Sequence, residues 1–212
     1  MAGPESISDR VIALLDHTFE SLAREDVPLS EVVFQAARVA RLRNDFDNLF
    51  WLELEQRAIG SREDFEALER EFAGHYSSAE LETLNKQVGL IWLKDRTTDL
   101  PGGLDVNEDK EQAIASSLKE IEAQMATVEE LTGGGDIPDG MHTLDVHAAF
   151  KEKQRLAVFA ARSRQAYQRV LDRVERRVRV FLSNTEKQVA FGQIKPTSSS
   201  ATGATWTSSS PR

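Results

Sequence analysis

Five runs in the first 96 residues repeat an apolar position every three or four residues. This spacing places apolar side chains along one face of a helix. The first run covers residues 7–22 and can be capped by Ser6 or Ser8, and the second opens at Pro28, which is tolerated at a helix start. The others begin after Asn44-Asp45, at Ser61 and at Ser77. The pattern predicts a compact bundle of helices over residues 6–96.

The second half of the chain has a different pattern. Residues 97–106 contain Pro101-Gly102-Gly103 and lack periodicity, so they are predicted to be a linker. Apolar positions over residues 107–131 follow a near-heptad spacing, and no Pro or Gly interrupts the chain from Thr143 to about Ala190. These two segments predict a long antiparallel helical hairpin over residues 107–191. Residues 192–212 are rich in Ser and Thr and are predicted to be a disordered tail.

The fold class expected from this pattern is all-α: an N-terminal bundle, a long hairpin and a loose tail. A helix of more than 40 residues, with a rise of about 1.5 Å per residue, exceeds the diameter of a small domain. It must therefore pack against the 107–131 helix, another chain, or both. Its apolar seam predicts a homo-oligomer or a helical protein partner, and consists of Tyr167, Val170, Val174, Val178 and Phe181.

Charge is distributed unevenly along the chain. The 212 residues carry a formal net charge of -9, but residues 151–187 hold 11 Lys and Arg against 4 Asp and Glu. This basic helix could pair with the acidic 107–131 helix or another subunit, contact phosphates of a nucleic acid or nucleotide, or face solvent. Pairing is favoured over nucleic acid, because the acidic first half would repel a polyanion. The basic face consists of Arg162, Arg169, Arg173, Arg176 and Arg177.

Few residues are suited to catalysis or to cofactor binding. The chain has no cysteine and only four histidines, so no metal site and no cofactor are expected. Glycine-rich phosphate loops and the nucleophile elbow of hydrolases have no counterpart here. No apolar run is long enough to span a membrane, and the first ten residues do not resemble a secretory leader, so a cytoplasmic protein is expected.

One segment matches a catalytic pattern. Arg70-Glu71-Phe72-Ala73-Gly74-His75 resembles the motif of HEPN-type helical ribonucleases, in which four to six residues separate Arg from His. The resemblance implies that the imidazole and the guanidinium act on the scissile phosphate, one moving protons and the other stabilising charge. A ribonuclease or toxin using Arg70 and His75 is therefore an alternative function, and a nucleic-acid or nucleotide sensor using the basic helix is another.

Residues 22–60 resemble the AbiTii domain, a helical module at the N-terminus of bacterial abortive-infection and related phage-defence proteins. The features that carry the likeness are Val27-Pro28-Leu29-Ser30, Arg41-Leu42-Arg43-Asn44 and Trp51-Leu52-Glu53-Leu54-Glu55. With the preceding helix the resemblance covers residues 7–60. It implies a role in phage defence and supplies no catalytic residues. The expected function is a non-enzymatic interaction or oligomerisation module, an adaptor or regulatory component of a defence system.

Overall fold

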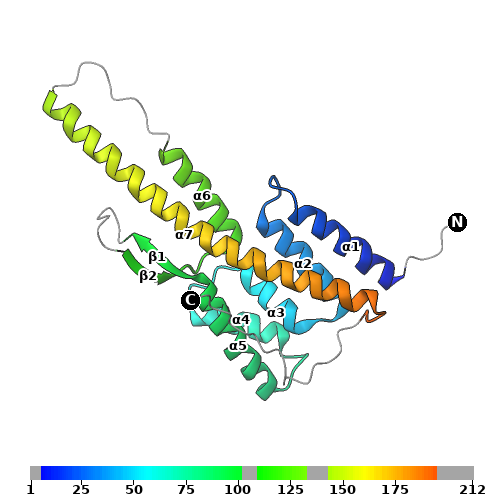
Figure 1. Cartoon of the computed structure of the whole chain (residues 1–212). Coiled ribbons are helices and arrows are strands. Elements are labelled where there is room, and N and C mark those ends of the chain that lie inside the picture. Colours follow the sequence, from blue (N-terminus) through cyan, green and yellow to red (C-terminus); the bar gives the residue numbers. More distant parts are fainter. Residues whose placement is uncertain (1–5, 102–108, 133–142, 195–212) are drawn as a thin grey trace, which may run out of the picture.

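The computed structural model describes residues 6–101, 109–132 and 143–194. These residues form helices with one small antiparallel sheet, which confirms the all-α fold class (Figure 1). None of the helices described is long and apolar enough to cross a membrane. In chain order the elements are α1 (Ile7–Leu22), α2 (Leu29–Arg43), α3 (Phe46–Glu55), α4 (Arg62–Phe72), α5 (Ser78–Arg96), β1 (Thr97–Pro101), β2 (Asp109–Ala113), α6 (Leu118–Thr132) and α7 (Thr143–Ala190).

The predicted starts of the N-terminal helices are confirmed. Ser6, Ser61 and Ser77 each cap a helix through a reciprocal pair of hydrogen bonds with the residue three positions on. Asn44 takes a left-handed conformation with φ 57°, which ends α2 and lets α3 begin directly afterwards. Helix α3 ends at Glu55, and the Ile59 amide then donates to the Ala115 carbonyl at 2.8 Å.

The segment predicted to be a linker is partly a strand. Residues 97–101 form β1, which pairs antiparallel with β2 so that Thr97 lies opposite Ala113 and Pro101 opposite Asp109. Two β-branched threonines favour the strand, and Thr98 is buried. Strand β1 lies against α7, so this segment is part of the packed structure.

The first helix of the expected hairpin starts later than predicted. Residues 109–113 are β2, and α6 begins at Leu118 rather than near residue 107. The Glu120 amide donates to Ser117 Oγ at 3.3 Å, while the Ser117 amide donates to the Glu120 carboxylate at 2.8 Å. This capping box fixes the start of α6.

The hairpin of α6 and α7 is confirmed, but its two helices differ greatly in length. α6 has 15 residues and α7 has 48, or about 22 Å and about 72 Å at the usual helical rise. Figure 1 shows one end of α7 lying along the N-terminal helices and the other running past the end of α6. Of the predicted tail at 192–212, only residues 192–194 are described; residues 195–212 lie outside the described part of the chain.

One hydrophobic core joins the bundle to the hairpin. It includes Val33 of α2, Phe50 of α3, Ile121 of α6 and Val174 of α7, all with no exposed surface. The core therefore includes side chains from both sides of the segment 97–106 that was predicted to be a linker.

Candidate functional site

The predicted seam of α7 is buried within its own chain. Val170, Val174 and Val178 are fully buried and Phe181 nearly so, whereas Tyr167 is half-buried. The Phe181 ring meets the Trp51 ring of α3 edge to face, with 6.4 Å between centroids. Four of the five seam residues therefore pack inside the chain, and the seam as a whole is not an open surface for a partner.

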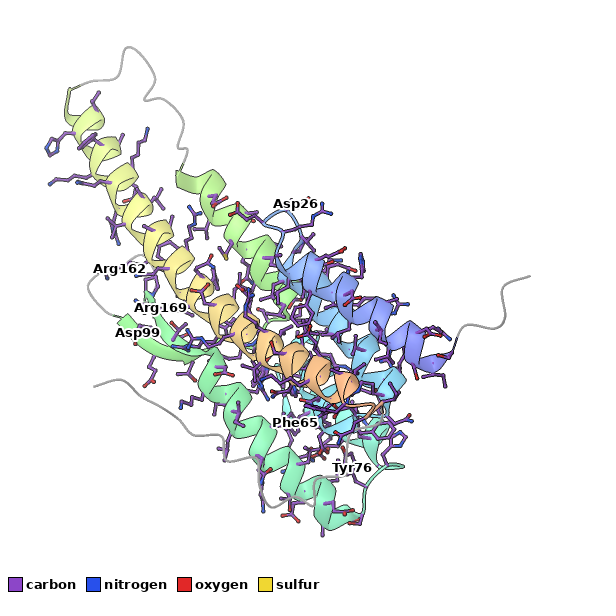
Figure 2. The ribbon with its side chains drawn as sticks, turned by 45° about the vertical axis from the view of Figure 1, so that its right-hand side comes forward. Asp26, Phe65, Tyr76, Asp99, Arg162 and Arg169 are labelled. Atoms are coloured by element: carbon purple, nitrogen blue, oxygen red, sulfur yellow. The ribbon has the colours of Figure 1, made fainter. Side chains whose placement is uncertain are left out.

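The basic face is divided between buried and exposed arginines. Arg173 Nη1 donates to the carbonyls of Asp95 at 3.1 Å and Thr97 at 2.8 Å, which satisfies the C-terminal end of α5 and complements its dipole. Arg177 is buried. Arg162, Arg169 and Arg176 are exposed. Figure 2 shows Arg162 and Arg169 beside Asp99, on the side of α7 where β1 packs.

The predicted pairing of the basic helix with the acidic helix is present at Arg164. Arg164 lies 2.6 Å from a carboxylate oxygen of Glu129 on α6. Arg173 and Arg177 instead point toward α5, so the sequence assigned these two to the wrong neighbour. Helical periodicity places residues on a face but does not say which element covers it.

Arg70 and His75 have separate environments. The Arg70 Nε donates to the Glu66 carbonyl one turn earlier in α4, at 3.2 Å. The His75 ring stacks on Phe46 at the start of α3, with 3.7 Å between ring centroids. No hydrogen bond or ion pair joins the two side chains in the described chain, although both are exposed.

A buried ion pair that the sequence analysis missed links α3 to α5. Glu55 and Arg96 have no exposed side-chain surface, and Arg96 reaches the Glu55 carboxylate through Nε at 3.1 Å and Nη2 at 2.5 Å. Its third nitrogen donates to the Ser116 carbonyl at 2.6 Å. Burial raises the pKa of Glu55, and the charge of Arg96 opposes that shift. The pair ties three segments together below the surface.

Arg177 lies close to this pair. Its guanidinium lies over the Trp51 ring, 4.3 Å from the centroid, and 3.7 Å from an Asp95 carboxylate oxygen. Burial raises the pKa of Asp95, and Arg177 is the largest opposing influence. The positive charges of Arg96 and Arg177 are thus balanced by the carboxylates of Glu55 and Asp95, in the region where α3, α5 and α7 meet.

Arg43, at the end of α2, anchors the other end of α7. It has no exposed side-chain surface, and it donates to Thr185 Oγ1 at 2.9 Å, to Gln188 Oε1 and to the Ile194 carbonyl at 3.0 Å. Asp45 lies 3.7 Å away and is also buried, which raises the pKa of its carboxyl. Because arginine has no acceptor, every one of these partners must accept from it.

The sequence held a signal for these buried charges. Glu55 follows Trp51 by four residues, Arg96 follows Trp92 by four, and Arg177 follows Val174 by three. Each is therefore a charged residue on the apolar face of its helix. Such a position indicates a buried pair, but the sequence does not give its partner.

The N-terminal part of α7 is packed differently from the rest. No residue from 146 to 159 is buried, and the first buried residue is Ala160. Phe150 is 57% exposed and Val158 39% exposed. We call residues 146–159 the arm. Within the described part of α7, the arm is the one stretch of more than three turns that contains no buried residue, and it exposes large apolar side chains.

Comparison with family models, with curated proteins and with solved structures gives no match for this chain. The described residues contain no group of three or more His, Cys, Asp or Glu side chains that could hold a metal ion. Function is therefore inferred from the geometry of the chain itself.

Proposed function

We propose that the chain is a non-enzymatic helical interaction module that self-associates through the arm. The observation that carries this proposal is the contrast along α7: the helix is firmly packed from Ala160 onward, but residues 146–159 are not. A helical segment of this length is marginal in water and gains stability mainly by packing an apolar face. Phe150 and Val158 provide apolar surface that a second chain would bury.

Charge favours a second copy as the partner. The arm carries Lys151, Lys153 and Arg155 against Glu152, whereas residues 1–150 hold 13 Lys and Arg against 31 Asp and Glu. Two arms would repel each other, but a basic arm and the acidic body of another copy attract. The proposed contact is therefore arm to body.

The contacts of the side chains give less support to the two alternative functions, a ribonuclease and a nucleic-acid or nucleotide sensor. Arg70 and His75 are each held by a different group, which favours a non-enzymatic function. Arg173 and Arg177 of the basic face are turned toward α5, which leaves fewer guanidinium groups for phosphates and favours a protein partner over nucleic acid.

Light scattering at micromolar concentration tests self-association. We expect the wild-type chain to form an oligomer, and the double variant Phe150→Glu, Val158→Glu to have a lower mass while keeping its helical circular dichroism. Gln165→Glu is the matched control, because Gln165 is an exposed residue of α7 outside the arm and outside the acidic residues 1–150; its mass should equal that of the wild type. A monomeric wild type, or an arm variant of unchanged mass, would overturn the proposal.

The resemblance of residues 7–60 to the AbiTii domain supports bacterial phage defence as the setting, with the module acting as an adaptor or regulatory component. Phage plating on cells that express the chain tests this role. The wild type and Gln165→Glu should restrict phage equally, and the arm variant should not. Equal plating on cells with and without the chain would remove the defence role but leave the assembly measurement intact.

A further inference from the structure

A cavity of about 190 Å³ lies between the start of α3 and the C-terminal half of α7. Its wall combines two aromatic rings with polar side chains from both elements. The polar groups and the ring that matter for its chemistry are Asp45, Trp51, Arg177, Asn184, Thr185 and Gln188. The volume suits a group of a few heavy atoms with a little water.

Arg43 leaves the cavity wall rich in donors. It donates to Thr185 Oγ1 and to Gln188 Oε1, so it takes up an acceptor site on each of these side chains. The Thr185 hydroxyl proton and the Gln188 amide N–H groups then remain free to donate. Because arginine cannot accept a hydrogen bond, Arg43 must be the donor in both of these bonds.

Arg177 adds a charged donor to the same wall. Its side chain is 8% exposed, and it makes no hydrogen bond within the described chain. Its Nε and Nη1 atoms are buried where the guanidinium lies over Trp51. The nearest Asp95 oxygen, at 3.7 Å, is beyond hydrogen-bond distance. Nη2 is the one guanidinium nitrogen of Arg177 that is not fully buried, so it is the nitrogen available to a ligand. A buried guanidinium without hydrogen bonds is costly, so an acceptor at this position stabilises it.

Asp45 is the one carboxylate among the described residues of the wall, and its oxygens have partners. Both accept from Asn48 Nδ2 at 3.0 Å, and one lies 3.7 Å from Arg43. Asn48 in turn accepts from the Trp51 indole N–H at 3.0 Å. The acceptors that α3 contributes to the wall therefore already have hydrogen-bond partners. Most of the polar groups still available to a ligand are donors from α7.

We propose that this cavity binds a compact oxyanion group, a phosphate or a carboxylate, with Arg177, Thr185 and Gln188 as its donors. Charge-assisted bonds from a guanidinium to an oxyanion are stronger than neutral ones, and the aromatic floor excludes water from one side. Asn184 stands exposed at the rim, where its amide adds a further donor. The site is independent of the arm and of self-association.

Isothermal titration of the full chain with sodium phosphate and, separately, sodium acetate tests the site, with ionic strength held constant by sodium chloride. We expect saturable one-site binding of at least one anion. Asn184→Glu places a carboxylate at the rim and should weaken binding about tenfold or more. Gln165→Glu adds the same charge at an exposed position of α7 away from the cavity and should leave binding unchanged.

Arg177→Lys keeps the charge that faces Glu55 and Asp95 but loses the planar fork, and should also weaken binding about tenfold or more. If that variant does not fold, the Asn184→Glu and Gln165→Glu pair still decides. Binding of phosphate alone identifies a phosphate site, and binding of acetate alone a carboxylate site. No saturable binding of either anion, or equal binding by Asn184→Glu and Gln165→Glu, would overturn the proposal.

Discussion

Single residues account for much of what joins the helices, and the pair Glu55–Arg96 is the clearest case. Both side chains are fully buried and hydrogen-bonded to each other. Removing one partner leaves an uncompensated charge in the interior. We expect Arg96→Met to lower the free energy of unfolding by about 3–5 kcal/mol, measured by urea denaturation at pH 7. The double variant Glu55→Leu, Arg96→Met should recover most of that loss, and a double variant as unstable as the single one would contradict this account.

The same carboxyl predicts a dependence on pH. Burial raises the pKa of Glu55, so the folded state holds this proton more tightly than the unfolded state. Its contribution to stability is then fully present below the unfolded pKa and is lost as pH rises through the folded pKa. Between about pH 4 and pH 7, wild type should therefore lose more stability than Glu55→Gln. Urea midpoints of both proteins across this range measure the difference, and a gap that changes in the opposite sense would refute the prediction.

At the scale of the elements, local signals set most helix starts. Ser6, Ser61 and Ser77 cap as their sequence indicates, and Ser117-Leu118-Lys119-Glu120 carries the same signal for α6, which begins there rather than near residue 107. The strand β2 could not be predicted, because Asp109–Ala113 has little intrinsic preference for strand. Its conformation depends on pairing with β1, which packs against α7.

The seam of α7 could be predicted from the sequence, but the cavity could not. Periodicity identified the seam and its burial, but not that Val174 would be covered by the same chain rather than a partner. The cavity requires the end of α2, the start of α3 and the C-terminal half of α7 to meet. Arg43 and Thr185 are 142 positions apart, and no local pattern relates them.

The seam can be tested by substitution within α7. Val174 is fully buried, so Val174→Ala should lower the free energy of unfolding by about 1–3 kcal/mol. Val174→Asp buries a carboxylate in the shared core and should unfold α1–α3 together with α7. Circular dichroism and amide hydrogen exchange measure this. Val158→Asp makes the same change in the exposed arm and should leave folding intact, whereas loss of α7 protection alone in Val174→Asp would show that the helices fold separately.

At the scale of the whole molecule, the bundle and the hairpin share their interior. α7 contributes Val170, Val174 and Leu182 to a core that also contains side chains of α2 and α3, and Arg177 covers the Trp51 ring. Without α7 the N-terminal helices would expose this face to water. A protein built in this way should unfold in one cooperative transition, with the buried charges and the core lost together.

This arrangement predicts that residues 6–96 do not fold alone. The isolated segment lacks the apolar side chains of α7 and leaves Glu55 and Arg96 near the solvent, so far-UV circular dichroism should show little helix and no cooperative urea transition. Adding a separate chain of residues 107–194 should restore helix and a sigmoidal transition, because it supplies the missing face. The variant Val174→Asp in that second chain should not. A stable, cooperatively unfolding 6–96 fragment would mean that the bundle is a domain in its own right and that α7 only docks onto it.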